Sequence, residues 1–119
     1  MRHSLLKLIL LLSAATLAAF GQDGKLYVVT HIDAEPNFTA DAKSLLRGFA
    51  SDSRKDPGAV RIEILEENGK PNHFTVVEVW QNQKDYESHL ATAHTKAFRA
   101  KLLPMLGSPF DERLHSAVQ

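Results

Sequence analysis

The sequence predicts one domain of the α+β class, and three observations support this. Apolar residues alternate with polar ones along several short stretches, the period of a β-strand, and recur at helical spacing along others. Turn-forming residues such as Asp56-Pro57-Gly58 and Asn68-Gly69 separate these stretches. The composition, with 44% hydrophobic and 24% charged side chains in 119 residues, is that of an ordinary globular protein.

Residues 1–21 are predicted to be a secretory signal peptide. Basic residues precede an apolar run, and Ala19 and Gly21 provide the small side chains that a signal peptidase requires for cleavage before Gln22. The run is shorter than the roughly 20 apolar residues of a membrane-spanning helix, and an uncleaved membrane anchor is the alternative. We therefore expect an exported protein, periplasmic or secreted, with its domain over 22–119 and no stable membrane insertion after cleavage.

Charge and cysteine content exclude several classes of function. The 14 basic and 14 acidic residues balance, so the sequence gives no indication of binding to nucleic acid. There are no cysteines, which excludes thiol nucleophiles and thiolate metal sites. A domain of about 100 residues buries only some 60–70% of its unfolded surface. Without disulfides to compensate, association into a homodimer is expected.

The first half of the domain is predicted to be a strand, a helix and a turn. The strand covers 26–33, where β-branched and aromatic residues alternate between two faces. Pro36 ends it, Thr39 is a candidate cap for the helix that follows, and Phe38 is its hydrophobic staple. The helix is predicted to end by Lys55. Its apolar residues recur at helical spacing: Ala42, Leu45, Leu46 and Phe49.

The second half is predicted to be a β-hairpin, two short helices and an edge strand. Alternating runs over 60–65 and 74–80 flank Asn68-Gly69, which indicates a hairpin with a loop of several residues. Helical spacing covers 84–91 and 95–103, and Pro104 ends the second of these helices. The last segment, 110–118, is ambiguous and is interpreted as an edge strand.

This order of elements is typical of a ferredoxin-like fold. Strand, helix, hairpin, helix pair and strand form the split βαβ arrangement, in which helices cover one face of a four-stranded antiparallel sheet. The other face stays apolar and uncovered. Packing against the same face of a second copy, or closure into a dimeric α/β-barrel, would bury it, which again predicts a dimer.

A pattern of residues is scattered along the whole domain. It starts at Asp56-Pro57-Gly58 and is clearest at 73–80, HFTVVEVW, which contains Glu-x-Trp. It continues through Tyr86, His89, His94, Phe98, Leu103-Pro104 and the closing 111–114. This pattern resembles the antibiotic biosynthesis monooxygenase family, the small dimeric, cofactor-free oxygenases that include the quinol monooxygenases.

The resemblance implies a reaction as well as a fold. The family's pocket lies between sheet and helices, and its monooxygenases oxidise an electron-rich phenol, hydroquinone or anthrone with molecular oxygen to a quinone. They use no flavin, haem or metal. The protein supplies an aromatic pocket, a base with a pKa near neutrality and hydrogen-bond donors for the substrate anion.

Three candidate catalytic residues are His89, His94 and Glu78. Glu78 shares a strand face with Trp80, because residues two apart point the same way. His89 is the leading base candidate, since it follows Tyr86 by three positions on one helical face. The predicted lining of the substrate pocket is Trp80, Tyr86, His31 and Phe98. Each of these residues also has a structural interpretation, as a core aromatic or as a polar group that satisfies a neighbour.

No metal site is predicted from these residues. His89 and His94 are five apart, about 140° around a continuous helix, and no acidic residue completes a metal-binding spacing. Two other functions remain open on the same fold. One is haem binding and degradation, with Trp80 against the haem and His89 or His94 as axial ligand. The other is a non-enzymatic exported binding or stress protein.

Overall fold

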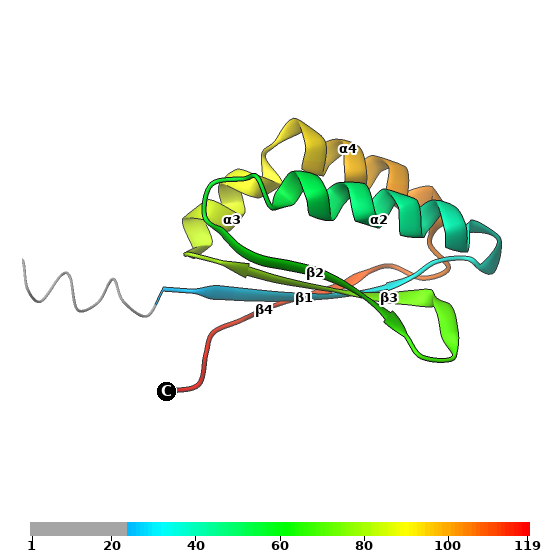
Figure 1. Ribbon diagram of the computed structural model, residues 1–119, viewed down its shortest axis with the longest axis horizontal. Helices are drawn as coiled ribbons and strands as arrows, with labels where there is room; N and C mark the ends of the chain where they lie inside the picture. The colour runs from blue at the N-terminus through cyan, green and yellow to red at the C-terminus, as the bar shows by residue number, and fades with distance from the viewer. Residues whose placement is uncertain (1–23) are drawn as a thin grey trace, which may run out of the picture.

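A computed structural model describes residues 24–119, so the predicted signal peptide lies outside the described residues. Within the described part of the chain, no helix is long and apolar enough to cross a membrane. The elements follow in the predicted order (Figure 1): β1 Leu26–Asp33, η2 Pro36–Phe38, α2 Thr39–Ser53, β2 Ala59–Glu67, β3 Lys70–Trp80, α3 Gln83–Leu90, α4 Ala93–Leu102, η3 Leu103–Met105 and β4 Asp111–His115.

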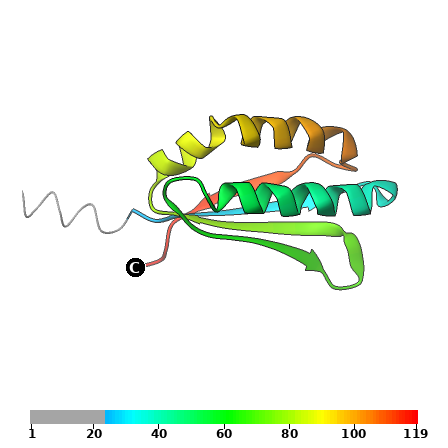
Figure 2. The same cartoon turned by 45° about the horizontal axis from the view of Figure 1, so that its top comes forward.

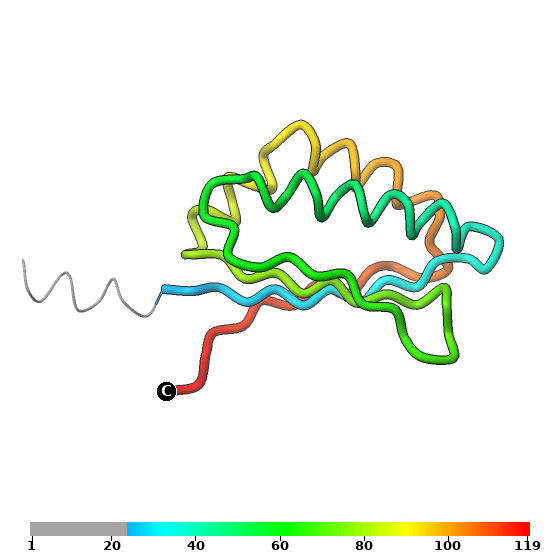
Figure 3. The backbone as a smooth tube through the Cα atoms, viewed as in Figure 1, coloured from blue at the N-terminus to red at the C-terminus, as the bar shows by residue number. Residues whose placement is uncertain are grey.

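The strands form one open four-stranded antiparallel sheet with the order β2-β3-β1-β4. The helices lie together on one face of it, with α2 and α4 side by side (Figure 2). This is the ferredoxin-like α+β fold, and the predicted fold class is confirmed. The tube view shows that no element of residues 24–119 covers the opposite face (Figure 3).

Strand pairing places the predicted alternation on the two faces of the sheet. Along β1, every second residue from Leu26 to Ile32 is buried beneath the helices. Val28 is the register partner of Glu78, and Ile32 is the partner of Phe74. Glu78 therefore lies on the helix-facing side of a central strand, in a row of buried side chains.

Side-chain caps fix the starts of the two short helices but not that of the long one. The Asn82 side chain accepts from Asp85 N at 2.8 Å at the start of α3, and Thr92 accepts from Thr95 N at 3.3 Å at the start of α4. The predicted capping role of Thr39 is wrong. Its hydroxyl donates to the Pro36 carbonyl at 2.7 Å, because a turn of 3-10 helix leads directly into α2.

The core has two apolar clusters, and a polar group lies between them. One cluster contains the stacked rings of Phe49 and Phe98, 4.1 Å apart. The other surrounds Trp80 and Tyr86. The ring of His89 lies 5.6 Å from the Phe49 ring and 4.4 Å from the Trp80 ring, so it contacts both clusters.

Candidate active site

Glu78 is a buried carboxyl group in the core of the domain. It is only 4% exposed, and its Oε1 accepts a hydrogen bond from Trp80 Nε1 at 3.1 Å. Burial disfavours the charged form and raises the pKa of Glu78 to about 7, although the bond from Trp80 opposes this shift. A carboxyl group with this pKa takes up and releases protons near neutral pH.

Glu78 lines a small cavity between the sheet and the helices. The cavity has a volume of about 20 Å³, enough for one water-sized molecule. Of its lining residues, only Arg99 and Phe110 are partly exposed, so they form its mouth. The complete lining is Thr30, Ile32, Phe49, Val76, Glu78, Phe98, Arg99, Leu102 and Phe110.

Arg99 holds a positive charge at this mouth. Its Nη2 donates to both carboxylate oxygens of Glu112 at 3.1 Å, and its guanidinium lies 5.3 Å from the centre of the Phe110 ring. Burial lowers the pKa of Arg99, while the nearby Glu78 acts in the opposite direction. The Tyr86 hydroxyl also donates to Glu112. An anion inside the cavity would therefore lie close to a fixed guanidinium.

His89 lies directly behind Glu78 and outside the cavity lining. Its Nε2 is 3.6 Å from Glu78 Oε1, and its Nδ1 is 2.7 Å from Asp56 Oδ2. Burial lowers the pKa of His89, and the bond to Asp56 opposes this. The imidazole is thus held neutral between two carboxyl groups.

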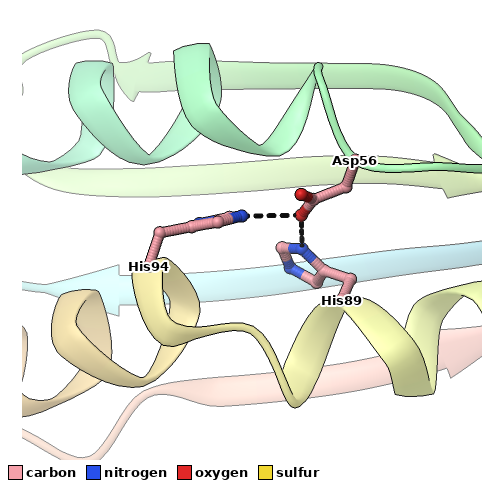
Figure 4. A group of neighbouring side chains, drawn as sticks. All are labelled: Asp56, His89 and His94. Atoms are coloured by element: carbon pink, nitrogen blue, oxygen red, sulfur yellow. Dashed lines mark hydrogen bonds and ion pairs between the residues drawn. The ribbon is translucent and has the colours of Figure 1, made fainter.

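Asp56 also contacts the second histidine (Figure 4). The Nε2 of His94 lies 2.7 Å from the same Oδ2 atom. Asp56 belongs to the turn between α2 and β2, His89 to α3 and His94 to the first turn of α4. The two histidines lie on separate helices, and Asp56 adds a third possible ligand atom from a part of the chain that local sequence spacing does not reveal.

Comparison with known proteins identifies the family. The profile of the antibiotic biosynthesis monooxygenase family matches residues 25–101. The chain belongs to this family. YcnE of Bacillus subtilis (strain 168), a proposed monooxygenase, is 28% identical over 85 residues, which are 71% of this chain and 85% of YcnE.

Solved structures of other bacterial proteins share the fold. A proposed antibiotic biosynthesis monooxygenase from Nitrosomonas europaea superposes with a TM-score of 0.75 at 21% identity, covering 79% of this chain and 99% of its own. PA3566 from Pseudomonas aeruginosa gives 0.76 at 18% identity, covering 82% and 98%. At this identity the likeness concerns the fold, and membership of the family indicates a monooxygenase-like function.

The structure separates the predicted site residues into three groups. Glu78 and Phe98 line the cavity. Trp80, Tyr86 and His89 are buried behind it, with His94 on the far side of Asp56, nearer the surface. The fourth predicted pocket residue, His31, is not part of this arrangement, because it lies on the uncovered face of the sheet, where it bonds to Thr75 at 3.1 Å.

Sequence reasoning missed four residues of the site: Asp56, Arg99, Phe110 and Glu112. Asp56 was read only as part of a turn, and its pairing with histidines 33 and 38 positions away has no local signal. Arg99 did have one. It lies four residues after Thr95 and three before Leu102, both buried on α4, which places a cation beside the inward face of the helix.

A further hollow lies elsewhere on the surface. It has a volume of about 350 Å³ between α2, β2 and β3, and none of the predicted site residues lines it. Its lining is largely charged at the rim, with Lys43, Arg47, Arg54 and Glu66. We therefore place the candidate active site at the cavity of Glu78, where a buried titratable group faces apolar walls.

Haem does not fit the aromatic cluster as it stands. Trp80 has no exposed surface and His89 is 2% exposed. Their rings pack against each other, with centres 4.4 Å apart, so no porphyrin face can lie between them. Haem bound in this way would require β3 and α3 to separate.

Proposed function

We propose that this protein is a monooxygenase that oxidises a phenol, hydroquinone or anthrone-type aromatic with molecular oxygen to a quinone, without flavin or haem. The observation that supports this most directly is the buried carboxyl group of Glu78 on the wall of an apolar cavity, with the guanidinium of Arg99 at its mouth. Membership of the antibiotic biosynthesis monooxygenase family supports the reaction class.

Glu78 is the general base in this proposal, in place of His89. A base must reach the proton that it removes, and Glu78 lines the cavity whereas His89 does not. With a pKa of about 7, about half of the Glu78 side chains are ionised at neutral pH. His89 and Trp80 then position the carboxyl group.

The chemistry uses the substrate's own electrons. Glu78 removes a proton, and the resulting carbanion or phenolate transfers electrons to oxygen as a carbon–oxygen bond forms. The peroxide takes the proton back from Glu78. Loss of the hydrogen that remains on the oxygenated carbon then breaks the oxygen–oxygen bond, leaving a carbonyl on the substrate and releasing one water. With an anthrone, the CH₂ group and O₂ become C=O and H₂O. With a phenol or hydroquinone, the first proton comes from a hydroxyl group and a ring C–H carbon is oxygenated, so C–OH, C–H and O₂ become two carbonyl groups and H₂O.

Arg99 stabilises the anion in this scheme. A phenol has a pKa near 10, about three units above that of Glu78, so proton transfer is uphill by roughly 4 kcal/mol unless the anion is stabilised. A positioned guanidinium provides such stabilisation as charge develops.

The cavity must widen to admit an aromatic substrate. Its volume of about 20 Å³ is far below the roughly 300 Å³ of ordinary ligand pockets. The partly exposed ring of Phe110 is the part placed to move, since Glu112 holds Arg99 and the rest of the lining is buried in the core.

Oxygen uptake with a panel of hydroquinones and anthrones tests this proposal. We expect turnover by the parent protein and a loss of about 10²–10⁴ in Glu78→Gln, the usual contribution of a general base. Glu87→Gln, at an exposed glutamate on α3, is the matched control and should retain full activity. No uptake by the parent with any compound would favour the non-enzymatic binding protein, and equal rates for Glu78→Gln would remove Glu78 as the base.

We also propose that the protein is an exported homodimer. The uncovered sheet face presents apolar side chains, among them half-buried Val29 and Val77 and Leu65, which is 47% exposed. Burial of this face against a second copy would compensate for a small core.

The proposal of export has its own test. N-terminal sequencing of the exported protein should begin at Gln22, and a sequence that began at Met1 would argue against cleavage.

A further inference from the structure

We propose that Asp56, His89 and His94 form a binding site for a divalent transition-metal ion of the Zn²⁺ type. The proposed oxidation needs no metal, and His89, which positions Glu78 there, also contributes a ligand atom here. The inference rests on the geometry of three side chains from three different elements and on the chemistry of their donor atoms.

The three ligand atoms converge on one point. Asp56 Oδ2, His89 Nδ1 and His94 Nε2 all lie within 4.8 Å of one another, and Figure 4 shows both rings directed at the carboxylate. Ligands of a tetrahedral zinc ion are about 3.3 Å apart, given metal–ligand distances near 2.0–2.1 Å. The two nitrogens are each 2.7 Å from Oδ2, so only small side-chain rotations are needed to admit an ion.

The donor set selects the class of ion. Two imidazole nitrogens and one carboxylate oxygen suit first-row transition metals such as Zn²⁺, Co²⁺ or Fe²⁺. Hard cations such as Mg²⁺ and Ca²⁺ prefer oxygen ligands throughout. Three protein ligands also leave a coordination position for water or another small ligand.

The surroundings hold two of the ligands in place. A histidine that binds a metal usually directs its other ring nitrogen at a carboxylate, and His89 Nε2 faces Glu78 Oε1 at 3.6 Å. The rings of Phe49, Trp80 and Tyr86 surround the same imidazole. Asp56 is fixed by the turn, where its amide donates to Ser53 O at 3.1 Å.

The site is reachable from solvent through His94. The His94 side chain is 25% exposed, against 1% for His89 and 13% for Asp56. His94 also lines a surface hollow of about 380 Å³ between α2 and α4, together with Asp52. An ion can therefore reach the ligands without passing through the cavity of Glu78.

Calorimetric titration of purified, tag-free protein with Zn²⁺, after treatment with a chelator, tests the site. We expect one ion per chain with micromolar or tighter affinity, and visible absorption bands when Co²⁺ is the probe. Mg²⁺ should give no heat of binding. Affinity weaker than millimolar for Zn²⁺ would overturn the proposal and leave Asp56 as a hydrogen-bond acceptor for two imidazoles.

A substitution at His94 separates metal binding from hydrogen bonding. His94→Gln keeps a donor that can reach Asp56 but removes the imidazole ligand, so it should fold normally by circular dichroism and weaken Zn²⁺ binding at least 100-fold. His31→Ala, at an exposed histidine on the other face of the sheet, should bind Zn²⁺ as the parent does. Unchanged affinity in His94→Gln, or equal loss in His31→Ala, would refute the site, and neither result depends on oxygenase activity.

Discussion

Trp80 donates its indole N–H to the carboxyl group of Glu78, two residues earlier on the same strand, with 3.1 Å between Nε1 and Oε1. This bond counters the effect of burial, because a donor stabilises the ionised form of the acid that accepts from it. The pKa of Glu78 reaches about 7 as the balance of the two. Trp80 thus acts on the cavity through Glu78 without lining it.

Removing this donor should raise the pKa of Glu78 further. In Trp80→Phe the aromatic packing is largely kept, but the hydrogen bond to the carboxylate is lost. Such a bond contributes about 1.5–3 kcal/mol, so we expect the pKa to rise by about one to two units. The pH at half-maximal oxygen uptake should move in the alkaline direction by the same amount. An unchanged midpoint would show that the indole N–H does not control the protonation of Glu78.

The buried carboxyl group should also make folding stability depend on pH. Its pKa rises from 4.5 to about 7 on folding, so between these values the folded state holds a proton that the unfolded state has lost. Stability is therefore greatest at acid pH and falls as pH rises through this window, by about 3 kcal/mol at most.

Glu78→Gln removes this titration and serves as the comparison. Urea unfolding from pH 4 to pH 8 should show that the variant gains stability relative to the parent as pH rises, with most of the difference present by pH 7. Parallel curves for the two proteins across this range would contradict a raised pKa of Glu78 in the folded state.

Gly58 fixes the turn that carries Asp56. Its φ is +83°, and a Cβ added there would overlap the side chain of Asp85 at the start of α3. Gly69 has the same φ of +83° but open space around it. Gly58→Ala and Gly69→Ala therefore both place a side chain on a left-handed backbone, at a cost of about 1 kcal/mol each. Only Gly58→Ala also brings its Cβ into overlap with Asp85.

We expect Gly58→Ala to lose at least about 1 kcal/mol more stability than Gly69→Ala, the lower end of the cost of overpacking. Thermal and urea unfolding of the two variants would measure this difference. Equal losses would show that Asp85 moves aside at little cost.

A charge on the uncovered sheet face should dissociate the proposed dimer. Val77 lies on this face in the middle of β3, between Val29 of β1 and Glu63 of β2. Val77→Arg should sediment as a monomer at micromolar concentration while the parent sediments as a dimer. Ala97→Arg, at an exposed position on α4, adds the same charge to the helix layer and should remain dimeric. A parent that sedimented as a monomer would rule out the dimer.

The strands and helices were predicted well because alternation and helical spacing are patterns within short stretches of the sequence. The strand expected over 26–33 is β1, and the two short helices begin and end within two residues of their predicted limits. The final strand is shorter than the predicted 110–118, at Asp111–His115, since its pairing with β1 ends at Tyr27. The prediction of Thr39 as a cap was wrong because the 3-10 turn Pro36–Phe38 precedes α2 directly. The spacing of apolar residues, which located the helix, gives no sign of such a turn.

The site was predicted less completely, since its geometry depends on distant parts of the chain. Strand alternation did place Glu78 beside Trp80, and helical spacing did turn His89 inward with Tyr86. The angle of about 140° between His89 and His94 holds only for a continuous helix, whereas the break between α3 and α4, at Leu90 and Ala93, lets both rings reach Asp56. The choice between His89 and Glu78 as base required knowing which of them reaches the cavity.

The central position of β1 has a consequence for how the chain folds. It is the first strand in the sequence, yet both of its edges are paired, Leu26 with Trp80 on one side and Tyr27 with His115 on the other. Neither partner exists until much later in synthesis, so folding must wait for long loops to close, which slows it. Until β4 emerges, an apolar strand keeps an open edge that can pair with another chain. The five residues of Asp111–His115 are therefore what protects the nascent protein from aggregation at that edge.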